Sequence, residues 1–241
     1  MEILLKISNR LQSLLGFVPY EGNDRATSEL NFRLKKARRA WTRQMKNLKN
    51  ELGVVILPDP TPELTADHLK NCQVVANRET ILHKMKKGGI TAEVGVQEGN
   101  FSKLILEICH PRELHLIDTL LSNYSIESKF KSEIDRGQVL LHENDSATAI
   151  SKLPDNHFDF IYIDADHSYK GVQRDIQVAK TKIKEGGFLI FNDYTYWSPG
   201  ECINYGVIRA VNELCIMDNW EMIYFALAGY MYCDVAIRKF D

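Results

Sequence analysis

The stretch ITAEVGVQEGNFS, residues 90–102, sets the architecture of the chain, because an apolar strand pattern here runs directly into a helix start. Gly95 and Gly99 lie at the junction, where glycine lets the backbone bend sharply and approach a ligand closely. The spacing is Glu-x-Gly-x-x-x-Gly, which fits a pyrophosphate-binding Gly-x-Gly-x-x-Gly fingerprint poorly. We expect Glu93 at the mouth of the turn, where a carboxylate suits a cationic ligand. The alternative is a structural turn with an incidental acid.

Strand-like and helix-like patterns alternate on both sides of this junction. Short apolar stretches occur at 90–96, 114–117, 138–142, 158–163 and 187–191. Helical stretches separate them at 100–109, 122–136, 145–153 and 168–184. Such alternation is typical of a parallel sheet with helices on both faces. It predicts an α/β, Rossmann-like, doubly wound fold.

The C-terminal end departs from this alternation. After a helix near 203–217, two further strand patterns follow, EMIYFALA and YMYCDVAIR, with only a short connection at Gly229. Adjacent strands joined this closely must be antiparallel. The prediction is therefore a seven-stranded sheet, with five parallel strands and an antiparallel terminal hairpin.

Residues 1–70 differ in pattern from residues 71–241, and we interpret them as an N-terminal helical cap or oligomerisation segment. Apolar residues from Ile3 to Leu15 recur every four positions, which indicates one helix face. A second helical pattern covers 33–49, which holds eight basic residues and no acidic one. This basic helix either binds an anionic surface or is a solvated face that caps a pocket or a second subunit, and we favour the latter. We therefore expect a homo-oligomer.

Composition excludes several classes of protein. The chain has 241 residues, of which 44% are hydrophobic and 26% charged, as in a globular protein with a core. No apolar run is long enough to span a membrane, and charges interrupt the first twenty residues, unlike a secretory signal. The five cysteines are scattered and never spaced Cys-x-x-Cys, so we expect a reduced, cytoplasmic protein without a structural zinc site. The net charge is −2 and no recognition motif is visible, so we expect no nucleic-acid partner.

Three acids follow the first three predicted strands. Glu93 ends the first, Asp118 the second, and Asp145 with Ser146 follows the third. An acid at the position of Asp118 can accept both hydroxyls of a ribose, whereas Asp145 alone would be interpreted as a helix N-cap. Carboxyl ends of parallel strands meet at one edge, where open α/β folds bind ligands. One acid would face an ammonium group, one a ribose and one an adenine, and S-adenosylmethionine carries all three groups.

The sequence DADHSYKG, residues 164–171, lies at the end of the fourth predicted strand. The sequence GGFLIFND, residues 186–193, contains the fifth predicted strand and the residues at its end. Oxygen donors from Asp164, Asn192 and Asp193 would suit Mg²⁺. His167 lies three positions after Asp164 and is placed to take a proton from a substrate hydroxyl, although a satisfied turn histidine is the alternative. Asp166 and Ser168 would be interpreted at least as readily as caps of the next helix. The aromatic residues Tyr194, Tyr196 and Trp197 either form a face for a ring-shaped acceptor or are buried under a lid.

Residues 90–193 resemble a class I S-adenosylmethionine-dependent methyltransferase, and the terminal hairpin is similar to that family's reversed seventh strand. The DADHSYKGVQRD and GGFLIFNDY motifs resemble the metal-dependent sugar O-methyltransferase branch, of the macrocin and mycinamicin type. The resemblance implies S-adenosylmethionine as cofactor, together with Mg²⁺. It also implies a small-molecule hydroxyl acceptor, most readily a sugar of a glycoside or glycosylated natural product.

The resemblance also implies roles for single residues. Catalysis falls to His167 as general base and to Asp164. Metal ligation falls to Asp164, Asn192 and Asp193, although Asn192 stands where that branch usually has a carboxylate. Cofactor binding falls to the following residues: Glu93, Gly95, Gly99, Ser102, Asp118, Asp145, Ser146 and Asp164. A catechol-like acceptor, a nucleotide-binding module without catalysis and a dinucleotide oxidoreductase are the alternatives.

Overall fold

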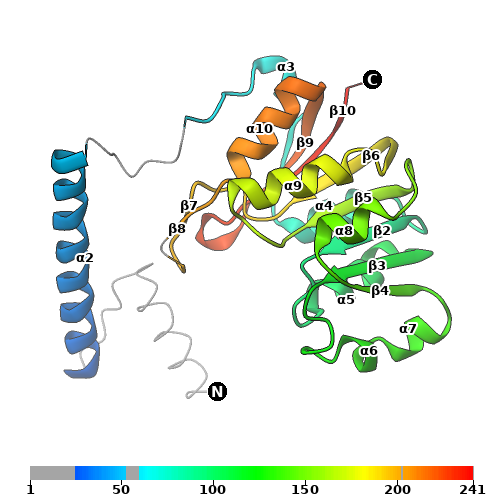
Figure 1. Ribbon diagram of the computed structural model, residues 1–241, viewed down its shortest axis with the longest axis horizontal. Coiled ribbons are helices and arrows are strands. Elements are labelled where there is room, and N and C mark those ends of the chain that lie inside the picture. Colours follow the sequence, from blue (N-terminus) through cyan, green and yellow to red (C-terminus); the bar gives the residue numbers. More distant parts are fainter. Residues whose placement is uncertain (1–24, 53–59, 202, 241) are drawn as a thin grey trace. The chain divides into compact units, whose positions relative to one another are not determined.

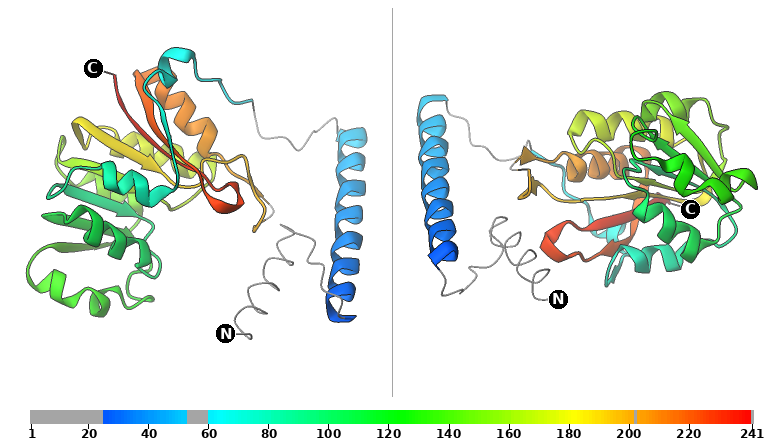
Figure 2. Two further views of the ribbon diagram at one scale, coloured as in Figure 1. Left: turned by 180° about the vertical axis from the view of Figure 1, so that it is seen from behind. Right: turned by 90° about the horizontal axis from the view of Figure 1, so that it is seen from below.

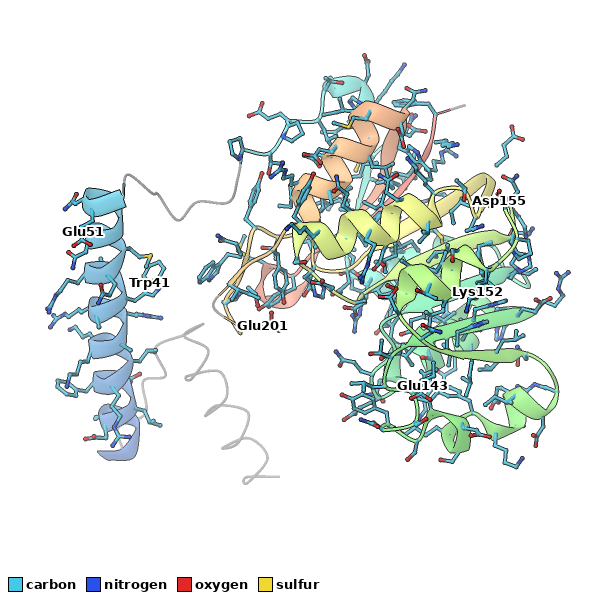
Figure 3. The ribbon with its side chains drawn as sticks, viewed as in Figure 1. Trp41, Glu51, Glu143, Lys152, Asp155 and Glu201 are labelled. Carbon is cyan, nitrogen blue, oxygen red and sulfur yellow. The ribbon has the colours of Figure 1, made fainter. Side chains whose placement is uncertain are left out.

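The computed structural model describes residues 25–52, 60–201 and 203–240, and the chain forms two compact units. Among the described residues, the smaller unit consists mainly of helix α2, Arg25–Leu52. The basic stretch 33–49 is therefore helical, as predicted, and its side chains, including Trp41, project around the helix (Figure 3). The predicted stripe from Ile3 to Leu15 lies outside the described residues. No helix in the described part of the chain is long and apolar enough to cross a membrane.

The larger unit, Pro60–Ser198 with Asn204–Asp241, is built on one mixed sheet (Figure 1). Within the described residues the sheet order is β1-β9-β10-β6-β5-β2-β3-β4. The strands are β1 (Gln73–Val75), β2 (Ile90–Val94), β3 (Glu113–Asp118), β4 (Val139–Glu143), β5 (Phe158–Ile163), β6 (Ile183–Phe191), β9 (Trp220–Ala226) and β10 (Asp234–Lys239). Strands β2 to β6 are parallel, whereas β10 is antiparallel to both β6 and β9. These are the five parallel strands and the terminal hairpin that the sequence predicts.

Helices cover both faces of the sheet, which gives three layers (Figure 2). The helices are α3 (Ala66–Leu69), α4 (Arg78–Lys84), α5 (Asn100–Cys109), α6 (Ile126–Lys129), α7 (Lys131–Asp135), α8 (Ser146–Ser151), α9 (Tyr169–Ala179) and α10 (Val207–Asp218). Buried residues of α8, α9 and α10 form one core with the sheet, and those of α4, α5 and α6 form the other. Two-residue strands β7 (Trp197–Ser198) and β8 (Ile203–Asn204) and the 3-10 turn η1 (Gly229–Met231) complete the described elements.

The structure adds to the predicted sheet and corrects the hairpin connection. Strand β1, which the sequence did not predict, pairs parallel with β9 at the sheet edge, so the sheet has one strand more than expected. Strands β9 and β10 pair as predicted, but their connection covers 227–233 and includes η1, rather than a tight turn at Gly229. The predicted strand boundaries were too wide because the apolar residues continue into the connection.

Two predicted helices also end differently. The pattern over 122–136 forms α6 and α7 instead of one helix, with a break at Phe130, whose side chain is buried against the glycine turn at Gly99. The pattern over 168–184 ends as a helix at Ala179, and β6 begins at Ile183 because it pairs there with β5. Apolar residues alone do not mark where a helix gives way to a strand.

The sheet has its topological switch between β2 and β5, since the chain runs outward to β3 and β4 on one side and to β6 on the other. Here the backbones touch: the amide of Asp164 donates to the carbonyl of Val94 over 2.7 Å. Gly95 has a φ of +87°, and a Cβ on it would lie 1.9 Å from the carbonyl oxygen of Asp164. Only glycine fits at this position.

We expect Gly95→Ala to destabilise the protein far more than Gly137→Ala. Both glycines have positive φ, but a Cβ on Gly137 meets nothing within 4 Å. Gly137→Ala should therefore show only the cost of left-handed backbone, about 1–2 kcal/mol, whereas Gly95→Ala adds a collision with backbone. Urea unfolding of both variants measures the difference. Equal losses would contradict the close contact of β2 and β5.

Candidate active site

The candidate site begins with a cavity of about 340 Å³ at the carboxyl ends of β2 to β5. Open α/β sheets bind ligands at this edge, beside the topological switch. The lining includes five of the predicted cofactor residues: Gly95, Asp118, Asp145, Ser146 and Asp164. It also includes residues that the sequence analysis did not name, among them Gln97, Thr119, Leu120, Tyr124, Asn144 and Arg174.

Asp118 ends β3 and fixes the loop that forms one wall of the cavity. Its Oδ2 accepts hydrogen bonds from the amides of Val96 and Gln97 at 2.8 and 3.0 Å. Its Oδ1 accepts one from the amide of Leu120 at 2.9 Å. A carboxylate offers about four lone-pair sites, so Asp118 can still accept hydroxyl groups while it holds the loop.

Asp145 and Ser146 lie at the start of α8, across the cavity. Asp145 is the N-cap of this helix, accepting from the amide of Thr148 at 3.1 Å, and pairs with Arg174 at 3.1 Å. Ser146 donates its hydroxyl to the buried Asp175 at 2.5 Å. The helix-capping interpretation of Asp145 is therefore confirmed. Capping does not remove it from the cavity, which both residues line.

Glu93 does not lie at the mouth of the turn, which corrects the sequence-based expectation. Strand alternation points its side chain to the α5 face of the sheet, where it is 1% exposed and accepts a hydrogen bond from Ser102. Burial raises the pKa of Glu93 to about 8, against the opposing effect of the Ser102 bond. Neither residue lines the cavity, and nor does Gly99, whose φ of +74° forms the turn into α5.

A second group of polar residues adjoins the cavity at the ends of β5 and β6. The Nε2 atom of His167 lies 3.3 Å from Oδ1 of Asn192, 3.5 Å from Oδ1 of Asp164 and 3.7 Å from Oδ2 of Asp193. The structure thus brings together all four residues that the two motifs predicted. The imidazole stacks on Tyr205 with ring centres 4.6 Å apart, which fixes its plane. Ser168 caps α9, as its alternative interpretation predicted.

The acids in this group influence one another. Burial raises the pKa of Asp164 well above its ordinary value, and the negative charges of Asp193 and Asp234 raise it further. Asp193 has a φ of +55°, a left-handed conformation that aspartate tolerates better than most residues. This backbone turn places Asp193 beside the imidazole instead of continuing β6.

A buried network behind this group holds Asn192 in one orientation. The Asn192 amide nitrogen donates to Oδ1 of Asp234 and to the hydroxyl of Tyr162, both at 3.2 Å. The Tyr162 hydroxyl donates to Oδ2 of Asp234 at 2.6 Å and accepts from Arg78 at 3.4 Å. With its nitrogen held from behind, Asn192 must present its oxygen to His167. No local sequence pattern pointed to Arg78, Tyr162 or Asp234, which meet only in the folded chain.

These residues fit a magnesium ion by the chemistry of their donors. Asp164, Asn192 and Asp193 each place an oxygen 3.3–3.7 Å from Nε2 of His167, and Mg²⁺ prefers oxygen ligands. The fixed orientation of Asn192 turns its amide oxygen toward this group, and the oxygen is the atom with which an amide would hold a metal ion. The site then has one negative charge fewer than two carboxylates after β6 would give.

The predicted aromatic cluster is divided in the structure. Tyr194 donates its hydroxyl to Asn212 of α10 at 2.5 Å and packs edge-on against Phe225, so it belongs to the core. Burial raises the pKa of Tyr194 above its ordinary value. Tyr196, by contrast, is 42% exposed. The ring that stacks on His167 is that of Tyr205, and nothing in the local sequence distinguishes it.

Comparison with known proteins agrees with the fold. A protein-family model described as "Methyltransferase domain" matches residues 92–194, which include both motifs and the cavity residues. A crystal structure of a SAM-dependent methyltransferase from Aquifex aeolicus is similar with a TM-score of 0.52 and 17% identity, covering 72% of this chain and 93% of that one. A Corynebacterium glutamicum protein is similar with a TM-score of 0.53 and 15% identity, over 83% and 89% of the two chains.

A curated relative is an uncharacterized protein of Acanthamoeba polyphaga mimivirus, 28% identical over 148 residues. The match covers 56% of this chain and spans 64% of that protein's length. The fold is the Rossmann-like fold of methyltransferases, and the family match supports a methyltransferase domain over residues 92–194.

We expect the stability of the protein to fall, relative to Glu93→Gln, as the pH rises from about 5 to about 8. The ordinary pKa of this carboxyl is 4.5 and its folded pKa is about 8, so between these values the folded state holds the extra proton. The free energy of unfolding then falls by up to about 1.4 kcal/mol per pH unit. Urea unfolding across this range measures the difference. Glu107→Gln, on the exposed side of α5, is the control, and a pH-independent difference for Glu93→Gln would contradict the assignment.

We expect Asn192→Asp to destabilise the protein above neutral pH by about 1–3 kcal/mol, because it sets a carboxylate against Asp234 in place of a hydrogen bond. The double variant Asn192→Asp with Asp234→Asn restores one amide and one carboxylate, and should recover most of this loss. Urea unfolding of the wild type, both single variants and the double variant gives the coupling between the positions. Strictly additive effects would show that the two side chains do not interact.

Proposed function

We propose that this protein is an S-adenosylmethionine-dependent O-methyltransferase that acts on a hydroxyl group, most specifically of a sugar in a glycoside or glycosylated natural product. One observation carries the proposal: Asp164 lines the cavity and also lies 3.5 Å from His167. A cofactor in the cavity and an acceptor at His167 would thus meet on either side of one residue. Methyl transfer needs this arrangement, since its rate depends on holding two reactants in line.

The cavity residues have the chemistry to bind the cofactor. We assign the ribose hydroxyls to Asp118, which lines the cavity, and the adenine side to Asp145 and Ser146, which also line it. Glu93 and Ser102 would act indirectly, because they are buried on the α5 face of the sheet and do not line the cavity. Bound S-adenosylmethionine would supply an electron-poor methyl group.

His167 is the proposed general base. An alcohol holds its proton too tightly at neutral pH to be a good nucleophile, so the imidazole of His167 would accept that proton as the oxygen takes the methyl group. Asp164 and Asp193, at 3.5 and 3.7 Å, would stabilise the imidazolium that results. Stacking on Tyr205 keeps the ring in position for this transfer.

Asp164, Asn192 and Asp193 would hold Mg²⁺, which when bound would lower the pKa of the acceptor hydroxyl. The choice of a sugar acceptor rests on the resemblance of the two motifs to the sugar O-methyltransferase branch.

Homo-oligomer formation through the N-terminal segment is a further part of the proposal. The helix α2 would serve it through its apolar positions.

The experiment that tests the proposal is calorimetric titration with S-adenosylhomocysteine, with and without Mg²⁺, and with NADH as the competing ligand. We expect binding of S-adenosylhomocysteine alone, weakened at least about tenfold by Asp118→Asn and unchanged by Asp135→Asn on the exposed surface of α7. His167→Ala should bind it as the wild type does. Methyl transfer to a panel of glycosides should fall about a hundredfold or more in His167→Ala.

Failure takes distinct forms in this experiment. Binding of NADH alone, or of neither ligand, would overturn the methyltransferase assignment. Equal loss of binding and turnover in His167→Ala would overturn its role as base. Transfer to catechols but not to glycosides would overturn the sugar acceptor and leave the O-methyltransferase in place.

A further inference from the structure

Three metal-binding side chains lie together at the other edge of the sheet, away from the cavity. Glu113 is the first residue of β3, and His115 is two positions further on, so both point to the same sheet face. His157 directly precedes β5. One ligand atom from each of the three lies within 4.8 Å of the other two. These are the amino ends of β3 and β5, whereas the cofactor cavity lies at the carboxyl ends.

A buried nitrogen without a hydrogen-bond partner marks the centre of this cluster. His115 is only 4% exposed, and its Nε2 atom has no hydrogen-bond partner. The nearest carboxylate oxygen, Oε2 of Glu113, is 3.8 Å away, which is too far for a hydrogen bond. An unpaired buried polar atom is costly, so a native structure has reason to give it a partner.

The surroundings of His115 prepare this nitrogen for a metal. Its Nδ1 atom lies 2.9 Å from Nε2 of His142, and when Nδ1 donates that bond, Nε2 carries the free lone pair. Metal-binding histidines commonly donate their second ring N–H in this way. Burial, followed by the charges of His142 and His157, lowers the pKa of His115 to about 4.

We propose that Glu113, His115 and His157 bind a divalent transition-metal ion of the zinc class. Two imidazoles and a carboxylate are a ligand set that Zn²⁺ accepts, with water in the fourth position. With bonds of about 2.0–2.1 Å, tetrahedral ligand atoms are roughly 3.3 Å apart. The 3.8 Å separation of Glu113 and His115 is close to this value, and the side chain of Glu113, which is 30% exposed, can move to close it.

Neighbouring charges leave the required atoms available. Arg112 donates to Oε1 of Glu113 at 3.2 Å, on the exposed side, so Oε2 stays directed at His115. His157 meets the His115 ring edge-on, with ring centres 5.6 Å apart. The scattered cysteines predicted no structural zinc site, and this one uses none of them. The ion would connect β3 to the segment that leads into β5, across the intervening β2.

The turn between α8 and β5 makes the cluster accessible. This turn carries Lys152 and Asp155, both labelled in Figure 3, and His157 follows two positions after Asp155. Lys152 and Asp155 are exposed, and His157 is half-buried. An ion can therefore reach the cluster without passing through the core, and the bound ion would hold this turn against β3.

The test uses the full chain after treatment with a chelator and dialysis. ZnCl₂ is titrated by calorimetry, and CoCl₂ by its visible absorption, which reports a nitrogen-containing, low-coordinate site. We expect tight binding of Zn²⁺ by the wild type, weakened at least about tenfold in His157→Ala and in Glu113→Gln. His83→Ala removes an exposed histidine of α4 and should bind as the wild type does. At the same Zn²⁺ concentration, the thermal midpoint should rise more in the wild type and in His83→Ala than in the two cluster variants.

The group around His167 is the competing site for an added metal, so His167→Ala is included. It should keep the cobalt spectrum and the tight Zn²⁺ binding, because its imidazole lies at the opposite edge of the sheet. The proposal is overturned if the wild type binds no Zn²⁺, if both cluster variants bind it unchanged, or if His167→Ala abolishes binding. Glu113→Gln keeps the shape of a partly exposed side chain, so a folded variant is available for comparison.

Discussion

The close contact of two backbones at the centre of the sheet governs the rest of the larger unit. The amide of Asp164 bonds to the carbonyl of Val94, and Gly95 has no room for a side chain against the Asp164 carbonyl. Because β2 and β5 touch at this point, the loop after β2 and the loop after β5 start side by side. One of them forms the cavity wall and the other carries His167, so the strand geometry alone places the cavity next to the group around His167.

The terminal hairpin supplies a buried acid, Asp234, to the group of residues at the end of β6. Strand β10 brings Asp234 behind the carboxyl end of β6, where Asn192 and Tyr162 surround it. Burial raises the pKa of Asp234 to about 6 while these hydrogen bonds lower it, so the group is largely ionised near neutral pH. A second carboxylate at position 192 would face it directly. An amide at position 192 suits the buried Asp234 behind it, because the Asn192 nitrogen donates to Asp234 and the Asn192 oxygen faces His167.

What the sequence could predict follows from strand alternation. The alternating pattern located the strand ends, and therefore the sheet edge at which Asp118, Asp164, His167 and Asp193 lie. The roles of these residues stay predictions. The pattern could not predict which face a residue at a strand end would take, and Glu93 lies under α5 instead of at the cavity. It also could not pair Tyr162 with Asp234, which are 72 positions apart and meet only because β10 inserts beside β6. Local patterns carry no information about such contacts.

The two edges of the sheet differ in the donors that they offer, and this difference bears on metal selectivity. At the carboxyl edge, oxygen atoms of Asp164, Asn192 and Asp193 face one imidazole, a set suited to a hard cation. At the amino edge, two imidazoles meet one carboxylate, a set suited to a borderline ion such as Zn²⁺. The oxygen-rich set would therefore hold Mg²⁺, and the nitrogen-rich set would hold Zn²⁺ beside β3 at the opposite edge. Because the two sets differ in donor type and lie at opposite edges of one sheet, each proposed site can be lost without removing the other.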